Sequence, residues 1–216
     1  MTTAPDGSPV DLYLRLPPAG EAERVHEAIP PGAEVLDLGC GVGRIAHELV
    51  RLGHPVVAVD ESLEMLRHVR GAETVQARVE ELELGRRVPC VLLASHLVNT
   101  SDADQRRAFL ETCARHVGRD GVVLIERHEP GWAPKEGVRG TMGDVTIALE
   151  DVRVDPPLIG VTVRYEADGQ TWRHPFDAQL LDDQALDEEL RAVGLHLSRV
   201  LDDRGAWVEA RLYSGT

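Results

Sequence analysis

The chain has 216 residues and a formal net charge of −14, which argues against nucleic acid or an anionic membrane surface as its partner, because both bind basic patches. This length suits one α/β domain with an ample core. The three cysteines, Cys40, Cys90 and Cys113, lack the spacing of metal ligands, so no metal is predicted. They are expected to be buried thiols in a reducing, cytoplasmic compartment, and neither a signal peptide nor a membrane-spanning segment is expected.

Two short segments precede the first predicted strand. Residues 11–18 are amphipathic and end at two prolines. Residues 21–29 are predicted to form a helix with Val25 and Ile29 on one face, ended by a Pro-Pro-Gly sequence.

A strand, a glycine turn and a helix follow. Residues 35–38 are apolar apart from Asp37 and indicate a buried strand, glycines occupy every second position in residues 39–43, and residues 45–52 place apolar side chains on one helical face. Glycine permits a tight turn and lets a ligand approach the backbone. The next apolar run ends in Asp60, 21 residues after the first glycine, close to the separation expected for a carboxylate that binds ribose hydroxyls. The stretch predicts the opening of a nucleotide-binding βαβ unit.

Two kinds of ligand fit such a unit, and the details of the turn separate them. A dinucleotide site has the spacing G-x-G-x-x-G, with the pyrophosphate at the helix N-terminus. Here the spacing is G-x-G-x-G, and Arg44 stands where the third glycine would fall. Asp37 suits a ligand with an ammonium group and suits a pyrophosphate poorly. S-adenosylmethionine has an ammonium, a sulfonium and a ribose diol, and no phosphate.

The turn at residues 35–44 resembles motif I of the class I S-adenosylmethionine-dependent methyltransferases, and residues 59–66 resemble their acidic second motif. The chain looks like a small-molecule enzyme of this family from a bacterium. A Rossmann-like domain with a different or inactive site is the alternative.

Strands and helices continue to alternate beyond these motifs, which predicts a parallel, doubly wound sheet. Ser62 is the predicted N-cap of the next helix. Residues 118–121 are predicted to be a turn that closes a later helix. The predicted elements of this part are a helix at 62–69, a strand at 73–78, an apolar central strand at 88–95, a helix at 101–117 and a fifth strand at 122–128.

After the fifth strand the pattern changes. Residues 145–149, 159–165 and 171–176 have a β-like composition, and an Asp-Gly hairpin turn joins the last two, which predicts an antiparallel insertion. A helix and a closing hairpin complete the chain, at residues 182–193, 195–201 and 206–213.

The predicted fold class is α/β, with a Rossmann-like doubly wound sheet that is mostly parallel, an antiparallel C-terminal hairpin, and a small antiparallel β insertion after the fifth strand. One methyltransferase domain is expected over residues 1–216. Its expected parts are an N-terminal cap (1–32), a cofactor-binding core (33–140), an insertion or lid (141–181), and a closing helix and hairpin (182–216).

The resemblance implies contacts to S-adenosylmethionine and to the product S-adenosylhomocysteine. The methionine half should lie over Asp37 and the glycine turn, and the ribose should bind Asp60. The adenine edge should meet Glu80 and the backbone of Val79, since Arg78 stands where the family commonly has an acidic residue. Alternatively, Glu80 is a solvated carboxylate favoured by the helix dipole, and Tyr13 only packs against the core. The predicted cofactor-binding residues are Tyr13, Asp37, Gly39, Cys40, Gly41, Asp60, Glu61, Met65, Val79, Glu80 and Ala94.

Two histidines are the candidate catalytic bases. Ligands of open α/β sheets bind beyond the carboxyl ends of the strands. His96 follows the fourth strand and His128 ends the fifth, so both imidazoles should border the place of methyl transfer. The alternative is that they only hydrogen-bond loop backbone. His174 on the insertion is a further candidate contact to the acceptor.

The sequence therefore predicts transfer of a methyl group from S-adenosylmethionine to O or N of a small molecule. The sulfonium is already activated, so the enzyme mainly aligns the reactants and excludes water, and a base matters only for a protonated acceptor. Two alternatives are a fold relative that uses S-adenosylmethionine for non-methyl chemistry or as a structural ligand, and a non-catalytic binding protein. The expected partners are a small-molecule acceptor and, through the insertion, a second copy of the chain, with neither nucleic acid nor membrane.

Overall fold

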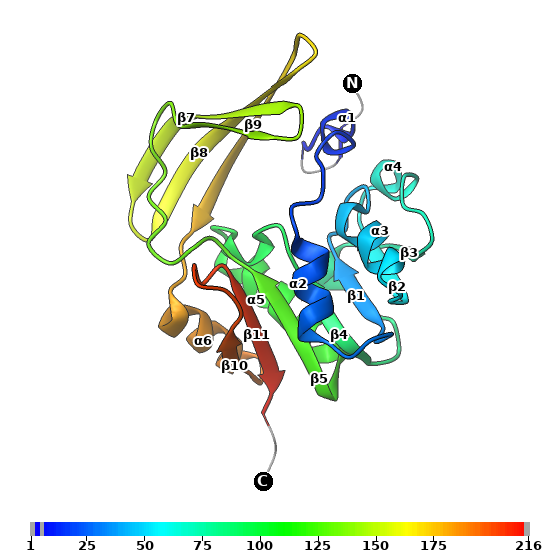
Figure 1. The fold of residues 1–216 in the computed structure, drawn as a ribbon. Coiled ribbons are helices and arrows are strands. Elements are labelled where there is room, and N and C mark those ends of the chain that lie inside the picture. Colours follow the sequence, from blue (N-terminus) through cyan, green and yellow to red (C-terminus); the bar gives the residue numbers. More distant parts are fainter. Residues whose placement is uncertain (1–2, 5–6, 214–216) are drawn as a thin grey trace.

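The chain folds around two β-sheets, which the computed structural model describes over residues 3–4 and 7–213 (Figure 1). The larger sheet contains β1 (Val35–Leu38), β2 (Val56–Asp60), β3 (Glu73–Gln76), β4 (Val88–Leu93), β5 (Val117–Glu126), β10 (Leu195–Val200) and β11 (Trp207–Leu212). Their order across the sheet is β10-β11-β5-β4-β1-β2-β3. β1 to β5 pair in parallel, whereas β11 is antiparallel to both β5 and β10. The predicted sheet with its antiparallel C-terminal hairpin is therefore confirmed.

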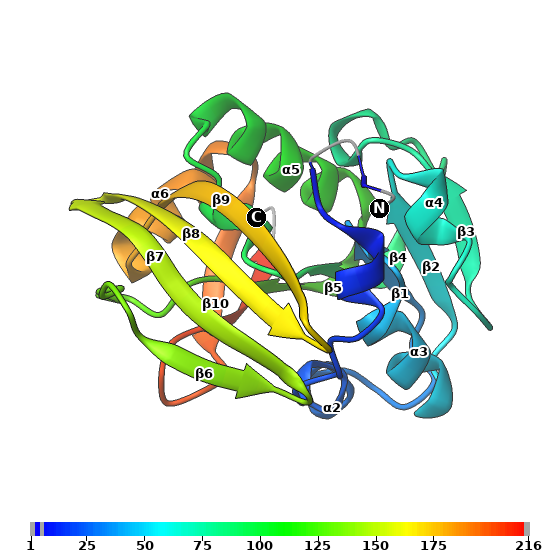
Figure 2. The same cartoon turned by 90° about the horizontal axis from the view of Figure 1, so that it is seen from above.

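The central strands β1 and β4 are buried on both faces, as their continuous apolar sequences predict. Every side chain of β1 is buried, and β4 exposes Pro89. One face of the sheet packs against α5 (Ala103–His116) and α6 (Asp183–Ala192), and the other packs against α2 (Glu21–Ala28) and α3 (Arg44–Arg51). Figure 2 shows α5 and α3 on opposite sides of the strands.

Side-chain caps start three of the helices. Ser62 Oγ accepts the N–H of Met65 at 3.3 Å and starts α4 (Leu63–Leu66), so the predicted N-cap is confirmed. Asp102 caps α5, and Asp182 caps α6. Within residues 3–4 and 7–213, no helix has the length and apolar character needed to cross a membrane.

The predicted turn at residues 118–121 is wrong. α5 gives way directly to β5, whose first residue Val117 pairs with Val88. The register shifts after this pair, so the glycine-containing residues form an irregularity within the strand. A Cβ at Gly121 would lie 2.7 Å from the carbonyl oxygen of Pro89, so glycine serves close approach of two strands here.

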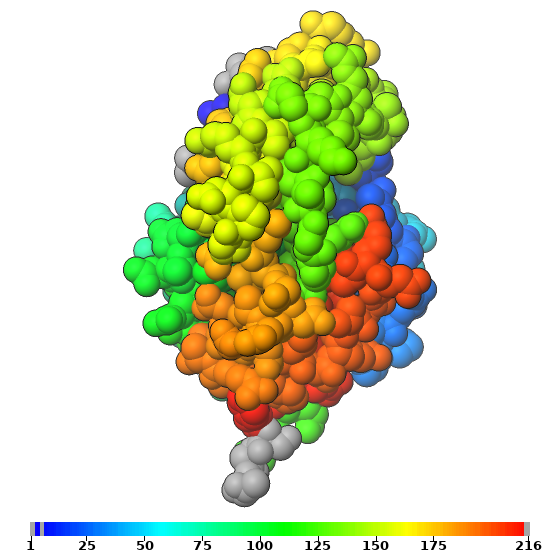
Figure 3. Space-filling view, turned by 90° about the vertical axis from the view of Figure 1, so that its left-hand side faces the viewer, coloured from blue at the N-terminus to red at the C-terminus, as the bar shows by residue number. Residues whose placement is uncertain are grey.

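The smaller sheet is the predicted antiparallel insertion. It contains β6 (Arg139–Met142), β7 (Val145–Asp155), β8 (Leu158–Ala167) and β9 (Gln170–Gln179), in the order β6-β7-β8-β9. β6 was not predicted, because its residues are mostly exposed and lack an alternating apolar pattern. Figure 3 shows the insertion above α6 and the C-terminal hairpin.

Buried polar side chains join the insertion to the core. Asn99, at the end of the short helix η2 (Leu97–Asn99), donates to the carbonyl of Gln179 at 2.8 Å and accepts the N–H of His128 at 2.8 Å. Arg106 of α5 is 1% exposed and donates to side-chain oxygens of Gln179 and Glu189. These bonds fix the end of β9 against the core.

The short helix α1 (Val10–Tyr13) connects the insertion with the glycine turn. Leu12 is fully buried against Trp172 of the insertion, whereas Val10 packs with Met65 beside the turn. The N-terminal segment therefore contacts both parts of the molecule.

Leu12→Ala should destabilise the fold strongly. Removing a fully buried leucine side chain leaves a cavity and costs about 2–5 kcal/mol of unfolding free energy. Leu14 lies two residues away and is 50% exposed, so Leu14→Ala is a matched control that should change the unfolding free energy by less than about 0.5 kcal/mol. Urea denaturation measures both values, and equal effects of the two substitutions would contradict the packing of α1.

Candidate functional site

Three glycines shape the turn between β1 and α3. Gly39, Gly41 and Gly43 have φ angles of +71°, +56° and +84°, in a region that residues with a Cβ rarely adopt. A Cβ at Gly39 would lie 2.6 Å from Cδ1 of Leu97, whereas a Cβ at Gly41 would meet no atom of the described residues within 4 Å. The turn is open at Gly41, and η2 covers it at Gly39.

Asp37 lies in β1 beside this turn and is 2% exposed. Its Oδ2 atom is buried and has no hydrogen-bond partner among the described residues. Burial, together with the Asp60 carboxylate, raises the pKa of Asp37 to about 7. A buried carboxylate without a partner is unfavourable unless a cation reaches it. The site therefore fits a ligand that brings an ammonium group to the glycine turn.

Asp60 ends β2 and faces the same turn. Its carboxylate oxygens accept the N–H groups of Gly41 and Ser62, each at 2.8 Å. The half-buried Glu61 follows, and its carbonyl accepts the side-chain amide of Gln76 at 3.2 Å. The fold thus brings Asp60 to the turn, as the βαβ pattern predicts, and its contact with a ribose stays a prediction.

The N-terminal segment covers the turn on one side. The half-buried Tyr13 packs in one cluster with Met65 and Val42. Arg44, at the position of the third dinucleotide glycine, forms an ion pair with Glu21 at the start of α2. The arginine therefore fastens the N-terminal segment to α3, a role that the sequence pattern did not reveal.

The other predicted cofactor residues lie at the ends of neighbouring strands. Arg78 Nε donates to Glu80 Oε1 at 2.8 Å, so this carboxylate already has a cationic partner. The Val79 side chain, in η1 (Val79–Glu81), and Ala94 both belong to the hydrophobic core. Cys40 is half-buried, and burial raises the pKa of its thiol.

The two candidate histidines lie side by side. The rings of His96 and His128 are stacked, with centroids 4.2 Å apart. Trp132 stacks on His128 at 4.4 Å, and Phe176 of β9 lies 6.0 Å from it. His174 lies two residues before Phe176 and so shares its face of β9. Neither Trp132 nor Phe176 was predicted as a site residue, because their meeting depends on where the insertion docks.

Burial disfavours the charged form of both histidines. It lowers the pKa of His96, although Glu126 and a backbone hydrogen bond to Arg127 act in the opposite direction. Burial and the neighbouring His96 lower the pKa of His128 to about 3. Both His96 and the preceding Ser95 have positive φ angles, of +59° and +54°, which are unusual for non-glycine residues and are found at functional sites. His96 Nδ1 is buried and finds no hydrogen-bond partner in the described part of the chain.

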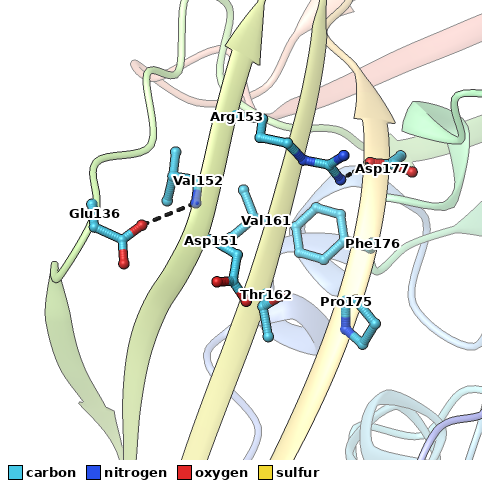
Figure 4. A pocket seen from close by; sticks show the side chains of 9 residues that line it. All are labelled: Glu136, Asp151, Val152, Arg153, Val161, Thr162, Pro175, Phe176 and Asp177. Atoms are coloured by element: carbon cyan, nitrogen blue, oxygen red, sulfur yellow. Dashed lines mark hydrogen bonds and ion pairs between the residues drawn. The ribbon is translucent and has the colours of Figure 1, made fainter.

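A cavity of about 630 Å³ lies on the antiparallel sheet, and the predicted cofactor residues do not line it (Figure 4). Its lining comes from β7, β8 and β9 together with Glu136, and includes Phe176. Arg153 and Asp177 form an ion pair of 3.0 Å within this lining. Over residues 3–4 and 7–213, no group of three or more His, Cys, Asp or Glu side chains is arranged to hold a metal ion.

Comparison with known proteins identifies sequences that are similar to this chain. Residues 35–121 match the family model described as a methyltransferase domain. An uncharacterized methyltransferase of Mycobacterium tuberculosis is 38% identical over 150 residues, which cover 64% of this chain and 60% of that protein. The cypemycin N-terminal methyltransferase of a Streptomyces species is 30% identical over 144 residues, covering 63% of this chain and 56% of that protein. The chain therefore spans about 60% of the length of the curated relatives it matches.

Solved structures agree on the fold. The sugar N-methyltransferase KedS8 from Streptoalloteichus has a TM-score of 0.71, with 99% of this chain and 96% of that chain covered at 20% identity. An S-adenosylmethionine-dependent methyltransferase from Clostridium acetobutylicum has a TM-score of 0.72, with 89% and 91% covered at 13% identity. The matched domain at residues 35–121 agrees with the methyltransferase resemblance carried by the two sequence motifs, and the solved structures share the fold.

Asp37→Asn should remove a pH dependence of stability. The pKa of Asp37 is raised from 3.8 to about 7, so the folded chain binds this proton more tightly than the unfolded chain. Its stabilising contribution is complete below about pH 4 and is lost as the pH rises through about 7. We expect the unfolding free energy of the wild type, relative to the variant, to fall by up to about 1.4 kcal/mol per pH unit over this range. Urea denaturation of both proteins without ligand tests this, and a difference that is constant with pH would contradict it.

Proposed function

We propose that this chain is a class I S-adenosylmethionine-dependent methyltransferase and that it transfers a methyl group from S-adenosylmethionine to an amine nitrogen of a small molecule. The observation that carries the proposal is the buried Oδ2 atom of Asp37 beside the glycine turn, which has no partner among the described residues. Two similar proteins support nitrogen as the acceptor atom, since one is named an N-terminal methyltransferase and the other a sugar N-methyltransferase. Neither the non-methyl nor the non-catalytic alternative gains support from the comparisons.

We assign different groups of the ligand to different residues around the turn. Bound S-adenosylmethionine supplies a methyl group on a sulfonium, whose C–S bond breaks with its electron pair returning to sulfur as the amine nitrogen bonds the carbon. We assign the ligand ammonium to Asp37 and the ribose hydroxyls to Asp60, because ionised carboxylates form strong bonds to both. Tyr13 and Met65 cover the adenosine, and the Val79 backbone meets the adenine edge. The other residues assigned to this site are Gly39, Cys40, Gly41, Glu61, Glu80 and Ala94.

The acceptor side lies over the ends of β4 and β5. An amine arrives as an ammonium ion and must lose a proton before its nitrogen can attack. His96 and His128 are neutral near pH 7, because burial lowers the pKa of each, so an imidazole nitrogen is available to take that proton. The remaining contribution is alignment of the two reactants and exclusion of water.

We assign a small-molecule acceptor and self-association through the insertion to this protein. Val138, Val154 and Leu158, in or beside the antiparallel sheet, are 50%, 48% and 46% exposed, and such apolar surface suits a contact between subunits. The net charge of −14 argues against nucleic acid. The three cysteines are free, which suits the cytoplasmic compartment expected from the sequence.

The first test of the proposal is ligand binding and turnover. S-adenosylhomocysteine should raise the melting temperature, by linkage worth about 2.7 kcal/mol at a concentration 100 times its Kd, whereas NAD should not. Incubation with S-adenosylmethionine and matched amines and alcohols, followed by mass spectrometry, should give S-adenosylhomocysteine and methylated amine. Stabilisation by NAD alone would overturn the cofactor assignment, and methylation of the alcohols alone would overturn nitrogen as the acceptor.

The matched variants for this test are Asp60→Ala and Glu64→Ala. Loss of charge-assisted hydrogen bonds worth about 1.5–3 kcal/mol should weaken S-adenosylhomocysteine binding of Asp60→Ala by at least about tenfold. Glu64 is 45% exposed in an ion pair with Arg67 on α4, so its substitution should leave the affinity unchanged. Isothermal titration measures both affinities.

The candidate bases are tested by His96→Asn and His128→Asn, which keep hydrogen bonding and remove basicity. If proton removal by a histidine limits the reaction, turnover should fall about 10²–10⁴-fold in one variant, with S-adenosylhomocysteine affinity retained. His68→Asn, outside the ring contacts, is the control and should turn over normally. Normal turnover in both test variants would show that alignment alone carries the reaction.

A further inference from the structure

Four rings from three segments meet above the carboxyl ends of β4 and β5. His96 precedes η2, His128 and Trp132 follow β5, and Phe176 belongs to β9. His128 stacks on His96 at 4.2 Å and on Trp132 at 4.4 Å, and Phe176 lies 6.0 Å from His128 at an interplanar angle of 14°. All four side chains are half-buried, so each keeps accessible surface. These four residues are called the ring cluster below.

The ring cluster is neutral near pH 7 and contains a ring nitrogen that has no hydrogen-bond partner among the described residues. Burial keeps both imidazoles uncharged by lowering the pKa of each. His96 Nδ1 is buried without a hydrogen-bond partner in the described residues. The arginines next to the cluster are already paired, Arg127 with Asp183 and Arg204 with Glu129. A cation approaching these rings therefore meets acceptor groups and π-faces, and no unpaired guanidinium from these two residues.

The ring cluster also borders the cofactor side of the site. Leu97, directly after His96, reaches to 2.6 Å from the position of a Cβ at Gly39. Phe176, at the other end, belongs to the insertion. The cluster is therefore linked to the glycine turn through Leu97 and to the antiparallel sheet through Phe176.

We propose that the ring cluster binds the ammonium group of the acceptor, and that Trp132 and Phe176 determine which amines are accepted. This inference rests on the proposed function and specifies its acceptor site. A cation over an aromatic face gains affinity of roughly two- to thirtyfold, most where water is excluded. An ammonium N–H donates to His96 Nδ1, while the carbon atoms around the nitrogen pack on the rings of Trp132 and Phe176. An alcohol of the same shape can make the hydrogen bond and lacks the cation–π attraction.

The two histidines then have different roles. His96 offers the free nitrogen and receives the proton that leaves the ammonium. His128, stacked against both His96 and Trp132, forms part of the wall. Phe176 comes from β9, and both it and Trp132 pack against the hydrophobic cluster of the antiparallel sheet, so this part of the wall depends on the docked insertion. His96 and His128 come from the core side.

The test compares cyclohexylamine with cyclohexanol, which share ring size and differ in charge. Each is titrated into protein saturated with S-adenosylhomocysteine, with binding followed by the indole N–H signals in NMR. We expect cyclohexylamine to bind at least about threefold more tightly and to move the signal of Trp132. Trp172 and Trp207 are 3% and 4% exposed, so their indole signals are internal controls that should stay in place.

Substitutions test which side chains cause the preference for the amine over the alcohol. Trp132→Leu and Phe176→Leu keep apolar volume and remove the aromatic faces, so the preference for the amine should shrink in each. Tyr213, 49% exposed near the end of the chain, gives the control variant Tyr213→Leu, which should retain the full preference. If Trp132→Leu does not fold, Phe176→Leu and the wild-type comparison still decide.

Equal binding of amine and alcohol to the wild type would overturn the ring-cluster assignment, as would a preference that survives in both leucine variants. Thermal stabilisation by S-adenosylhomocysteine monitors the proposed function separately. Stabilisation without an amine preference overturns the acceptor site alone. Absence of stabilisation overturns the proposed function, whatever the rings bind.

Discussion

The arrangement of the site depends on the buried amide of Asn99. It donates to the carbonyl of Gln179 and accepts the N–H of His128, both at 2.8 Å. One side chain thereby fixes the end of β9 relative to the segment that follows β5. Leaving this buried amide without hydrogen-bond partners would cost about 1–3 kcal/mol. The two bonds therefore favour this arrangement of the junction over any that breaks them. Phe176 meets His128 because the junction holds β9 in this position.

The proposed cofactor and acceptor sides of the site differ in charge. On the proposed cofactor side, Asp37 and Asp60 place two carboxylates near the glycine turn, and burial together with the Asp60 carboxylate raises the pKa of Asp37. On the acceptor side, His96 and His128 are kept neutral by burial. The first half requires a cationic partner, whereas the second accepts a cation without charge repulsion and has a free nitrogen that can take its proton. This division suits methyl transfer from a sulfonium to an amine.

The comparisons follow the same division. The matched methyltransferase domain covers residues 35–121, which contain the glycine turn and Asp60. Trp132, Phe176 and the whole antiparallel sheet lie beyond that span. The part shared with the family model therefore contains the proposed cofactor half and His96, whereas His128, Trp132 and Phe176 of the proposed acceptor half lie in the segment that follows it. This is physically reasonable, because one cofactor imposes one geometry while acceptors differ in shape and charge.

The sequence by itself determined the doubly wound sheet, the glycine turn and the approach of Asp60 to it, because continuous apolar strands and a G-x-G-x-G turn allow few other βαβ arrangements. It also indicated that His96 and His128 share one sheet edge, since both follow parallel strands. It missed β6, the continuation of β5 through residues 118–121, and the meeting of Trp132 with Phe176. Those features depend on register, on exposed backbone pairing and on the docking of one sheet against another. Such long-range contacts leave no periodic pattern in the chain, so only the tertiary structure decided them.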